Sequence, residues 1–207
     1  MRNTGPKCRN CRREGTKLFL KGAKCFTSKC AFDRRPFAPG VHGPSQTRPR
    51  VTAFGTQLRE KQKAKRIYGL LERQFSNYVM EASSSQGNTG EHLRQLLETR
   101  LDNVIYRLGL AESRAAARQL VSHGHVLVNG HKLDIASYHV EVDNVITFDK
   151  EAQGLIAKRS EAIAKANRPA WLDYDAKALT GRVLSKPVSK DMETSFDVTP
   201  IIEYYSR

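Results

Sequence analysis

Apolar residues recur at intervals of three and four along two long stretches of the chain. The first stretch runs from residue 57 to residue 82, and its repeat consists of Leu58, Ile67, Leu70, Leu71, Phe75, Tyr78 and Val79. The second stretch stops at Gly109, and its repeat consists of Leu93, Leu96, Leu97, Leu101, Val104, Ile105 and Leu108. This spacing is typical of amphipathic helices that bury one face, so it predicts a helix in each stretch. The polar, turn-rich segment SSSQGNTG, residues 83–90, predicts the loop between them.

The pattern changes after residue 112. Ser113 is placed to cap a third helix, which closes at Gly124. The segment HVLVNGHKLDI then alternates around Asn129 and Gly130, a pair typical of a two-residue hairpin turn with positive φ angles. YHVEVDNVITF predicts two more short strands. In the remaining chain EAQGLIAKRSEAIAKA predicts a helix, and the segments from GRVLSKPV through PIIEYY predict strands.

The composition is that of a globular protein without a membrane anchor. The chain has 207 residues, 39% of them hydrophobic, and its mean hydropathy is -0.55. No apolar run approaches the roughly 20 residues that a bilayer crossing needs, and the first 20 residues lack the apolar core of a signal peptide. We therefore expect a soluble, cytoplasmic protein with no membrane partner.

The positive charge is concentrated in the first third of the chain. The formal net charge is +14, and the sequence pI is about 9.9. Residues 1–70 contain 18 Lys or Arg against three acidic residues, whereas residues 71–207 contain 17 against 18. This segregation favours RNA or DNA as the partner of the first third. A membrane surface is the weaker alternative, because Pro, Gly and Cys interrupt any basic amphipathic helix before residue 56.

All four cysteines lie in that basic third, as two closely spaced pairs. Two residues separate Cys8 from Cys11, and four separate Cys25 from Cys30. Pairs with this spacing can present four thiolates to one tetrahedral ion, so a structural Zn²⁺ site is favoured. An iron–sulfur cluster on the same thiolates, and free or redox-active thiols, stay open as alternatives. Because the segment is poor in large apolar residues, we expect the ion to supply its folding energy.

Basic residues of three neighbouring segments are candidates for contact with a phosphate backbone. The first cysteine pair is surrounded by Lys7, Arg9, Arg12 and Arg13. The proline-rich stretch of residues 34–50 is predicted to be extended, and a flexible linker is the alternative. Its candidate contact residues are Arg34, Arg35, His42, Arg48 and Arg50, beside Phe37. The segment REKQKAKR places five cations along the first predicted helix: Arg59, Lys61, Lys63, Lys65 and Arg66. A charged face that contacts only solvent is the alternative.

A second candidate surface begins with the third predicted helix. Arg114 and Arg118 lie one helical turn apart, and His123 and His125 follow at the end of the helix. Together with Lys132 on the hairpin they can form a concave basic surface. Ordinary surface charge on an exposed helix is an equally open alternative. The histidines of this region do not have the spacing of a metal site.

The order helix, turn, SRAAARQLVSHGHVLVNG and hairpin resembles the S-four RNA-binding module of ribosomal proteins, some pseudouridine synthases and tyrosyl-tRNA synthetases. Four further segments resemble the family of bacterial small-subunit ribosomal protein S-four: RRPFAPGVHG, QLREKQKAKRIYGLLERQF, PAWLDYD and the terminal EYYSR. The resemblance covers nearly the whole chain in the same order. One departure is the stretch SSSQGNTG, which looks longer than usual and affects only the expectation for that loop.

The resemblance implies a structural protein that binds the 5′ domain of 16S rRNA and initiates assembly of the small subunit. It also implies a place at the mRNA entrance channel beside the proteins S-three and S-five, a role in decoding accuracy and, in some bacteria, repression of the protein's own mRNA. The four-cysteine version of the family implies metal ligation by Cys8, Cys11, Cys25 and Cys30. The RNA-facing helix of the family matches Gln57, Lys61, Gln62, Lys63, Arg66 and Tyr68, and the binding surface of its module matches Arg114, Arg118, Gln119, Ser122, His123, Gly124, Asn129 and Gly130.

The expected fold is therefore α+β. A basic, metal-clamped arm at residues 1–45 leads into a helical rRNA-binding domain at residues 46–95. The inserted S-four RNA-binding module, a helix-turn-helix with a small antiparallel sheet, occupies residues 96–150. A C-terminal helix and strands at residues 151–207 are expected to pack back on both.

Two other function classes are less consistent with the sequence. The triplet Arg100, Leu101 and Asp102 resembles the catalytic-aspartate motif of some pseudouridine synthases, but Asp102 is expected to face solvent or to pair with a neighbouring arginine. The sequence has no glycine-rich phosphate loop, no nucleophile with a partnered base and no carboxylate pair in a plausible cleft, so an enzyme is not expected. A zinc-bearing DNA-binding regulator is disfavoured, because a helix that begins SRAAAR lacks the polar side chains that read bases at its start.

Overall fold

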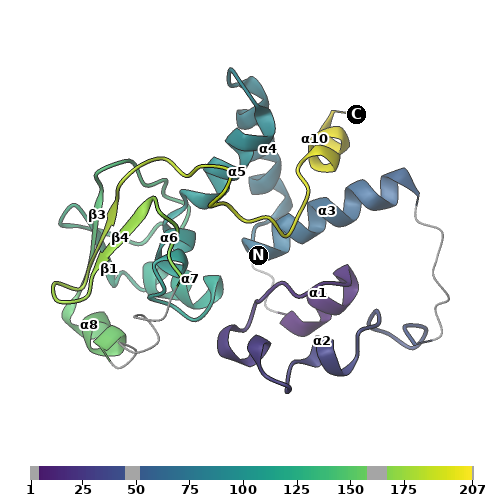
Figure 1. The fold of residues 1–207 in the computed structure, drawn as a ribbon, viewed down its shortest axis with the longest axis horizontal. Helices are drawn as coiled ribbons and strands as arrows, with labels where there is room; N and C mark the ends of the chain where they lie inside the picture. Colours follow the sequence, from purple (N-terminus) through teal and green to yellow (C-terminus); the bar gives the residue numbers. More distant parts are fainter. Residues whose placement is uncertain (1–4, 45–51, 158–166, 207) are drawn as a thin grey trace. The chain divides into compact units, whose positions relative to one another are not determined.

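The computed structural model describes residues 5–44, 52–157 and 167–206 (Figure 1). Contacts between residues divide the chain into two compact units. The first comprises Met1–Gly90 and Thr194–Arg207, and the second comprises Glu91–Glu193. The C-terminal segment therefore returns to the unit in which the chain begins.

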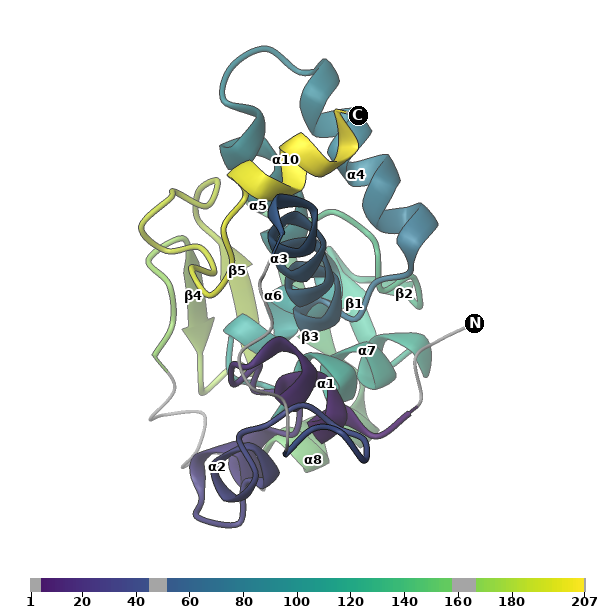
Figure 2. The ribbon, with the colours of Figure 1, turned by 90° about the vertical axis from the view of Figure 1, so that its right-hand side faces the viewer.

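The first unit is helical in the residues that the structure describes. Its elements are α1 (Lys7–Glu14), the 3-10 helix η1 (Gly22–Phe26), α2 (Ala31–Arg34), α3 (Ala53–Ile67), α4 (Glu72–Ser84) and α10 (Thr199–Tyr205). Thr52 begins α3 by accepting a hydrogen bond from the backbone N–H of Gly55. The C-terminal helix α10 packs against α3, crossing it in Figure 2, and Ile201 of α10 is fully buried.

The first amphipathic stretch is two helices and not one. The backbone turns at Gly69, whose φ of 63° lies in the left-handed region that ends helices. The backbone N–H of Leu70 donates to the carbonyl of Lys65 across this turn. α4 then extends two residues into the predicted loop, where the hydroxyls of Ser83 and Ser84 donate back to carbonyls of the preceding turn.

The second unit packs short helices against an antiparallel sheet. It contains most of α5 (Thr89–Glu98), α6 (Leu101–Arg107), α7 (Arg114–Ser122) and α8 (Lys150–Ala157). The sheet has the order β2-β1-β3-β5-β4, with β1 (Val126–Val128), β2 (His131–Leu133), β3 (Val145–Phe148), β4 (Leu172–Asp175) and β5 (Thr180–Val183). The backbone of β5 lies so close to Leu108, the residue that follows α6, that a Cβ on Gly181 would stand 2.6 Å from its Cδ1. One core of buried aliphatic residues, Phe148 and Trp171 joins the helices to the sheet.

The predicted α+β class, the helix cap and the hairpin are confirmed. The hydroxyl of Ser113 accepts from the backbone N–H of Ala116 at the start of α7. Asn129 and Gly130 connect β1 and β2 with φ angles of 50° and 81°, as the turn sequence requires. No helix in the described part of the chain is long and apolar enough to cross a membrane.

Three further predicted elements are wrong in detail. The second amphipathic stretch is broken into α5 and α6 at Arg100, whose extended backbone pairs with His139 in an isolated bridge. YHVEVDNVITF forms the single named strand β3, because a turn at Asp143, with a φ of 68°, takes up the middle of the segment. PIIEYY is helical in α10, since Pro200 suits a first helical turn. Residues 158–166 of the predicted C-terminal helix lie outside the described residues, as do Arg48 and Arg50.

Candidate nucleic-acid interface

The arm formed by residues 5–44 presents most of its cations to solvent. Its exposed basic side chains are Arg9, Arg13, Lys21, Lys24, Lys29, Arg34 and Arg35. The segment contains two acidic residues, Glu14 and Asp33. Asp33 pairs with Lys17 at 2.6 Å, and the side chain of Glu14 is completely buried. Little negative charge therefore remains to oppose a polyanion at this surface.

A cavity with a strongly basic lining lies in the arm. Its volume is about 440 Å³, and it is lined by Cys8, Arg12, Lys24, Lys29, Ala31, Arg34 and Arg35. Arg12 is fixed in this wall, because its guanidinium donates to the carbonyls of Phe37 and Ala38 and lies 5.0 Å from the centre of the Phe37 ring. Among the described residues, five cations and no carboxylate line the cavity, which suits a phosphate group.

The four cysteines gather in the same arm. None of them forms a disulfide, and Cys11, Cys25 and Cys30 are buried. Burial raises the pKa of the Cys11 thiol. A backbone hydrogen bond with Leu18 lowers this pKa, and the charges of the other three cysteines raise it further. The backbone N–H of Lys21 donates to Sγ of Cys25 at 3.4 Å.

The chemistry of this donor set fits a thiophilic ion such as Zn²⁺, since the other three thiols all lie near enough to Cys11 to raise its pKa. Their arrangement in the structure is not a closed coordination site: among the described residues no group of three or more His, Cys, Asp or Glu side chains is placed to hold a metal ion. Metal ligation by the four cysteines stays a prediction.

The cations of α3 are largely engaged within the first unit. Lys61 is 3% exposed, and its ammonium lies 2.5 Å from Glu72 and 4.3 Å from the centre of the Tyr204 ring. Lys65 reaches the same carboxylate, and Lys63 pairs with Glu60 at 2.6 Å. Burial opposes the charge on Glu72, but hydrogen bonds from Lys61, Lys65 and Tyr205 outweigh it and lower the pKa of Glu72 to about 2.

Two arginines of α3 fix the arm to the helical part of the same unit. Arg59 and Arg66 both bond to Oε1 of the buried Glu14. Burial raises the pKa of Glu14, and the charges of Arg66 and Arg59 oppose that rise. Gln57 is also buried and donates to Glu203 at 2.9 Å. These predicted RNA-facing residues therefore have partners inside the protein, and their contact with RNA stays a prediction.

Tyr68 and Gln62 complete the residues predicted on this helix. Tyr68 is buried and packs edge-on against Phe196, with ring centres 6.2 Å apart. Gln62 is partly exposed. The structure thus places Tyr68 in the core and leaves Gln62 at the surface.

In the second unit, Arg118 of α7 holds Asp102 of α6. Nε of Arg118 lies 2.7 Å from Oδ2 of Asp102, and Arg100 binds the same carboxylate through two nitrogens at 3.1 and 3.0 Å. Asp102 is 2% exposed. Of the two placements expected for Asp102, pairing with an arginine is therefore confirmed.

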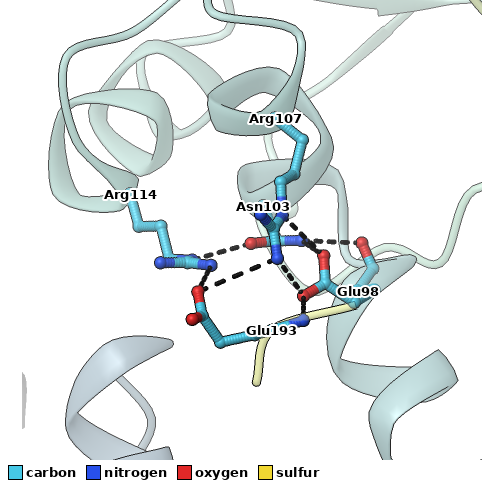
Figure 3. A network of polar contacts seen from close by, with 5 residues as sticks. All are labelled: Glu98, Asn103, Arg107, Arg114 and Glu193. Carbon is cyan, nitrogen blue, oxygen red and sulfur yellow. Dashed lines mark hydrogen bonds and ion pairs between the residues drawn. The ribbon is translucent and has the colours of Figure 1, made fainter. Parts of the chain in front are cut away.

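Arg114 belongs to a second network, which Figure 3 shows. Its guanidinium binds Asn103 at 2.7 Å and Glu193 at 3.0 Å. The buried Glu98 accepts from Asn103 and, through both carboxylate oxygens, from Arg107. The backbone N–H of Glu193 also donates to Glu98. The network ties the ends of α5 and α7 to α6 and to the last residue of the unit.

The remaining predicted residues of the module lie around the end of α7 and the hairpin. Gln119, His123, Asn129, Gly130 and Lys132 are exposed, and Ser122 is partly exposed. Gly124 is buried beneath Lys132, where a Cβ would stand 2.4 Å from Cε of the lysine. His125 instead bonds to Asp149 at 2.9 Å. The predicted concave basic surface is thus reduced to His123 and Lys132, because carboxylates engage both arginines.

The sequence reasoning missed several parts of this surface. Lys24 and Lys29 line the cavity beside residues that were predicted, and their position between the cysteines of a basic segment was an available signal. Phe19 and Phe26 lie exposed in the same arm. No sequence pattern indicated Glu98 or Glu193 as partners of the module's arginines.

Comparison with known proteins identifies the family. The family model described as "Ribosomal protein S4/S9 N-terminal domain" matches residues 2–98, and the one described as "S4 domain" matches residues 99–146. "Small ribosomal subunit protein uS4" of Dictyoglomus thermophilum is 52% identical over 206 residues, which cover 100% of this chain and 99% of the relative. The corresponding protein uS4A of Clostridium botulinum is 52% identical with the same coverage, and uS4 of Heliobacterium modesticaldum is 50% identical over 208 residues. The chain therefore belongs to the bacterial uS4 family.

Proposed function

We infer that this chain is a structural protein of the small ribosomal subunit, located in the cytoplasm, that binds ribosomal RNA and neighbouring ribosomal proteins. The uS4 family is structural and not enzymatic. The observation that carries the inference for this chain is the arm: seven exposed cations lie on a segment whose two carboxylates are paired or buried. Long-range attraction to phosphates follows from that surface.

A more specific proposal concerns the rRNA site that the protein binds and its roles in assembly and translation. It binds the 5′ domain of 16S rRNA, initiates assembly of the small subunit, lies at the mRNA entrance channel beside the proteins S-three and S-five with a role in decoding accuracy, and represses its own mRNA. The support is the resemblance of segments along nearly the whole chain to the S-four family. Rigid helical surfaces, such as those held by the networks of Asp102 and Glu98, suit recognition of a folded RNA by shape.

The four cysteines are proposed to hold Zn²⁺, with an iron–sulfur cluster on the same thiolates as the alternative. A bound ion would supply folding energy to an arm with few buried apolar side chains. The nearby exposed cations Arg9, Arg13, Lys24 and Lys29 would offset the negative charge of a four-thiolate site and still face the RNA.

The test is binding of the purified protein to a transcript of the 5′ domain of 16S rRNA, at near-physiological salt, with excess transfer RNA and duplex DNA as competitors. Binding that survives both competitors is expected. Because phosphate contacts dominate, affinity should fall by orders of magnitude between about 50 and 200 mM salt if roughly 6 to 10 phosphates are engaged. Equal loss to either competitor would contradict specific rRNA binding, and a preference for duplex DNA would favour a DNA-binding regulator.

A further inference from the structure

Two phenylalanines form an exposed aromatic stack on the arm. The rings of Phe19 and Phe26 lie with their centres 5.0 Å apart and their planes inclined by 25°. Phe26 is 74% exposed and Phe19 is 38% exposed. Phe19 covers one side of the Phe26 ring, so the high exposure of Phe26 leaves the rest of its surface open to solvent. A large aromatic side chain in this state has given up little contact with water on folding, which indicates a role other than packing.

The backbone holds this pair in place at a cost. Phe19 has a φ of 49°, in the left-handed region that a bulky residue rarely adopts. Phe26 ends the 3-10 helix η1, directly after the buried Cys25. Strained residues of this kind concentrate at binding sites, because the surrounding fold must maintain them for some purpose other than stability.

The surroundings of the pair are basic. Lys21 and Lys24 precede Phe26, Lys29 follows it, and all three are exposed. The segment that contains Phe26 also contains Lys24 and Lys29, which line the 440 Å³ cavity. Arg12, Arg34 and Arg35 are the other cations of its lining. Of the two acidic residues in the arm, Asp33 is paired and Glu14 is buried. Residues 24–29 therefore carry both an open ring surface and two of the five cations that line the cavity.

We propose that this part of the arm binds an unpaired nucleotide of RNA, with its base stacked on Phe26 and a phosphate in the cavity lined by Arg12, Lys24, Lys29, Arg34 and Arg35. Stacking on an exposed ring combined with cations along the backbone is how proteins hold single-stranded nucleic acid. A base within a duplex cannot offer its face to the ring. An apolar protein partner would have to desolvate the lysines around Phe26, whereas phosphates complement their charge. The proposal rests on the proposed rRNA binding and names the RNA feature that the arm recognises.

The experiment measures dissociation constants of the full-length protein and its variants for the 5′-domain transcript at one fixed salt concentration. Phe26→Ala and Phe26→Leu are both expected to bind roughly 5- to 150-fold more weakly, because each removes the ring. Phe26→Trp is expected to bind as tightly as the parent, which also shows that position 26 tolerates substitution. The matched control is Met80→Ala, which removes a 65% exposed apolar side chain from α4 and is expected to leave affinity unchanged.

The phosphate site is tested by the salt dependence of the same binding. Lys24→Ala and Lys29→Ala are each expected to lower the slope of log affinity against log salt by about one. Lys177→Ala, at an exposed position of the second unit, is the control and should leave the slope unchanged.

The possible failures are distinguishable. If the parent protein does not bind the transcript, rRNA binding itself is contradicted. If the parent binds and Phe26→Ala binds within twofold of it, the stacking site is overturned and the exposed pair is left as a surface for a protein partner. If Phe26→Leu restores the affinity that Phe26→Ala loses, the contact is apolar and does not depend on an aromatic ring, which also overturns the proposal.

Discussion

The ammonium of Lys61 lies 2.5 Å from Oε1 of Glu72, and the hydroxyl of Tyr205 donates to the same oxygen at 2.8 Å. Lys61 comes from α3, Glu72 begins α4 and Tyr205 ends α10. The three elements of the first unit therefore share one charge centre. Lys61 also lies 4.3 Å from the ring centre of Tyr204, so the terminal aromatic residues hold it on a second side.

Replacement of Lys61 should affect stability more than RNA binding. Lys61→Ala is expected to lower the free energy of unfolding by about 2 kcal/mol, because it removes a buried ion-pair partner and a cation–ring contact, with Glu72 still able to reach solvent. Urea denaturation of the RNA-free protein measures this loss. The slope of rRNA affinity against salt should be unchanged, since the ammonium already has a carboxylate. A slope lowered by about one would instead support the predicted contact of Lys61 with RNA.

The charge centre around Glu72 predicts that the stability of the fold decreases at acid pH. The pKa of Glu72 is lowered from 4.5 to about 2 in the folded protein, so its ionised form favours folding. This contribution is complete above the unfolded pKa and is lost as the pH falls from about 5 to about 2. Allowing for solvent screening of a half-exposed carboxylate, we expect it to be about 1 kcal/mol.

The measurement for Glu72 is the difference in unfolding free energy between the parent protein and Glu72→Gln. This difference should be present at pH 7 and should shrink between pH 5 and pH 2. A difference of constant size across that interval would contradict the assignment, because titration of Glu72 would then contribute nothing to folding.

The sequence predicted most of the helices and the hairpin correctly, but it did not predict where one helix ends and the next begins. Helices, cap and hairpin follow from local patterns that the fold preserves. The break at Arg100 depends on contacts from far along the chain, because the backbone N–H of Leu101 donates to the carbonyl of Tyr138 at 2.8 Å. The segment PIIEYY has the β-branched and aromatic residues of a strand, but packing against α3 makes it helical.

The candidate site shows the same limit. The basic segments and the cysteine pairs are visible as composition and spacing. Which cations remain exposed depends on partners distant in sequence, such as Glu14, 52 positions from Arg66, and Glu193, 79 positions from Arg114. Charge counting therefore indicated the arm correctly as basic, but it could not indicate that α3 and α7 direct much of their charge inward.

Asp102 should be structural and indispensable to the module. Asp102→Ala leaves the guanidinium of Arg100, which is 1% exposed, buried without this carboxylate. Removing one partner of such a buried pair costs about 3–5 kcal/mol, measured by urea denaturation. The matched control is Asp143→Asn, which removes the largely exposed pair with Arg182 and keeps a residue type that tolerates the positive φ of this position, so it should cost less than about 1 kcal/mol. Similar losses in the two variants would contradict the central position of Asp102.

Metal removal should affect the two units differently. If the four cysteines hold Zn²⁺, the purified protein contains about one equivalent of zinc by elemental analysis, and a chelator releases it with loss of order in the arm. Limited proteolysis should then cleave within residues 5–44 much faster than before, while the second unit, whose core of aliphatic residues and Trp171 does not involve the cysteines, stays resistant. Cys11→Ser should reproduce the effect without a chelator, because Cys11 is buried and is one of the four proposed ligands. An arm that keeps its resistance after complete removal of the ion would show that burial of Leu18 and the ion pairs of Glu14 suffice to order it. Iron and sulfide in the purified protein, in place of zinc, would assign the same thiolates to a cluster.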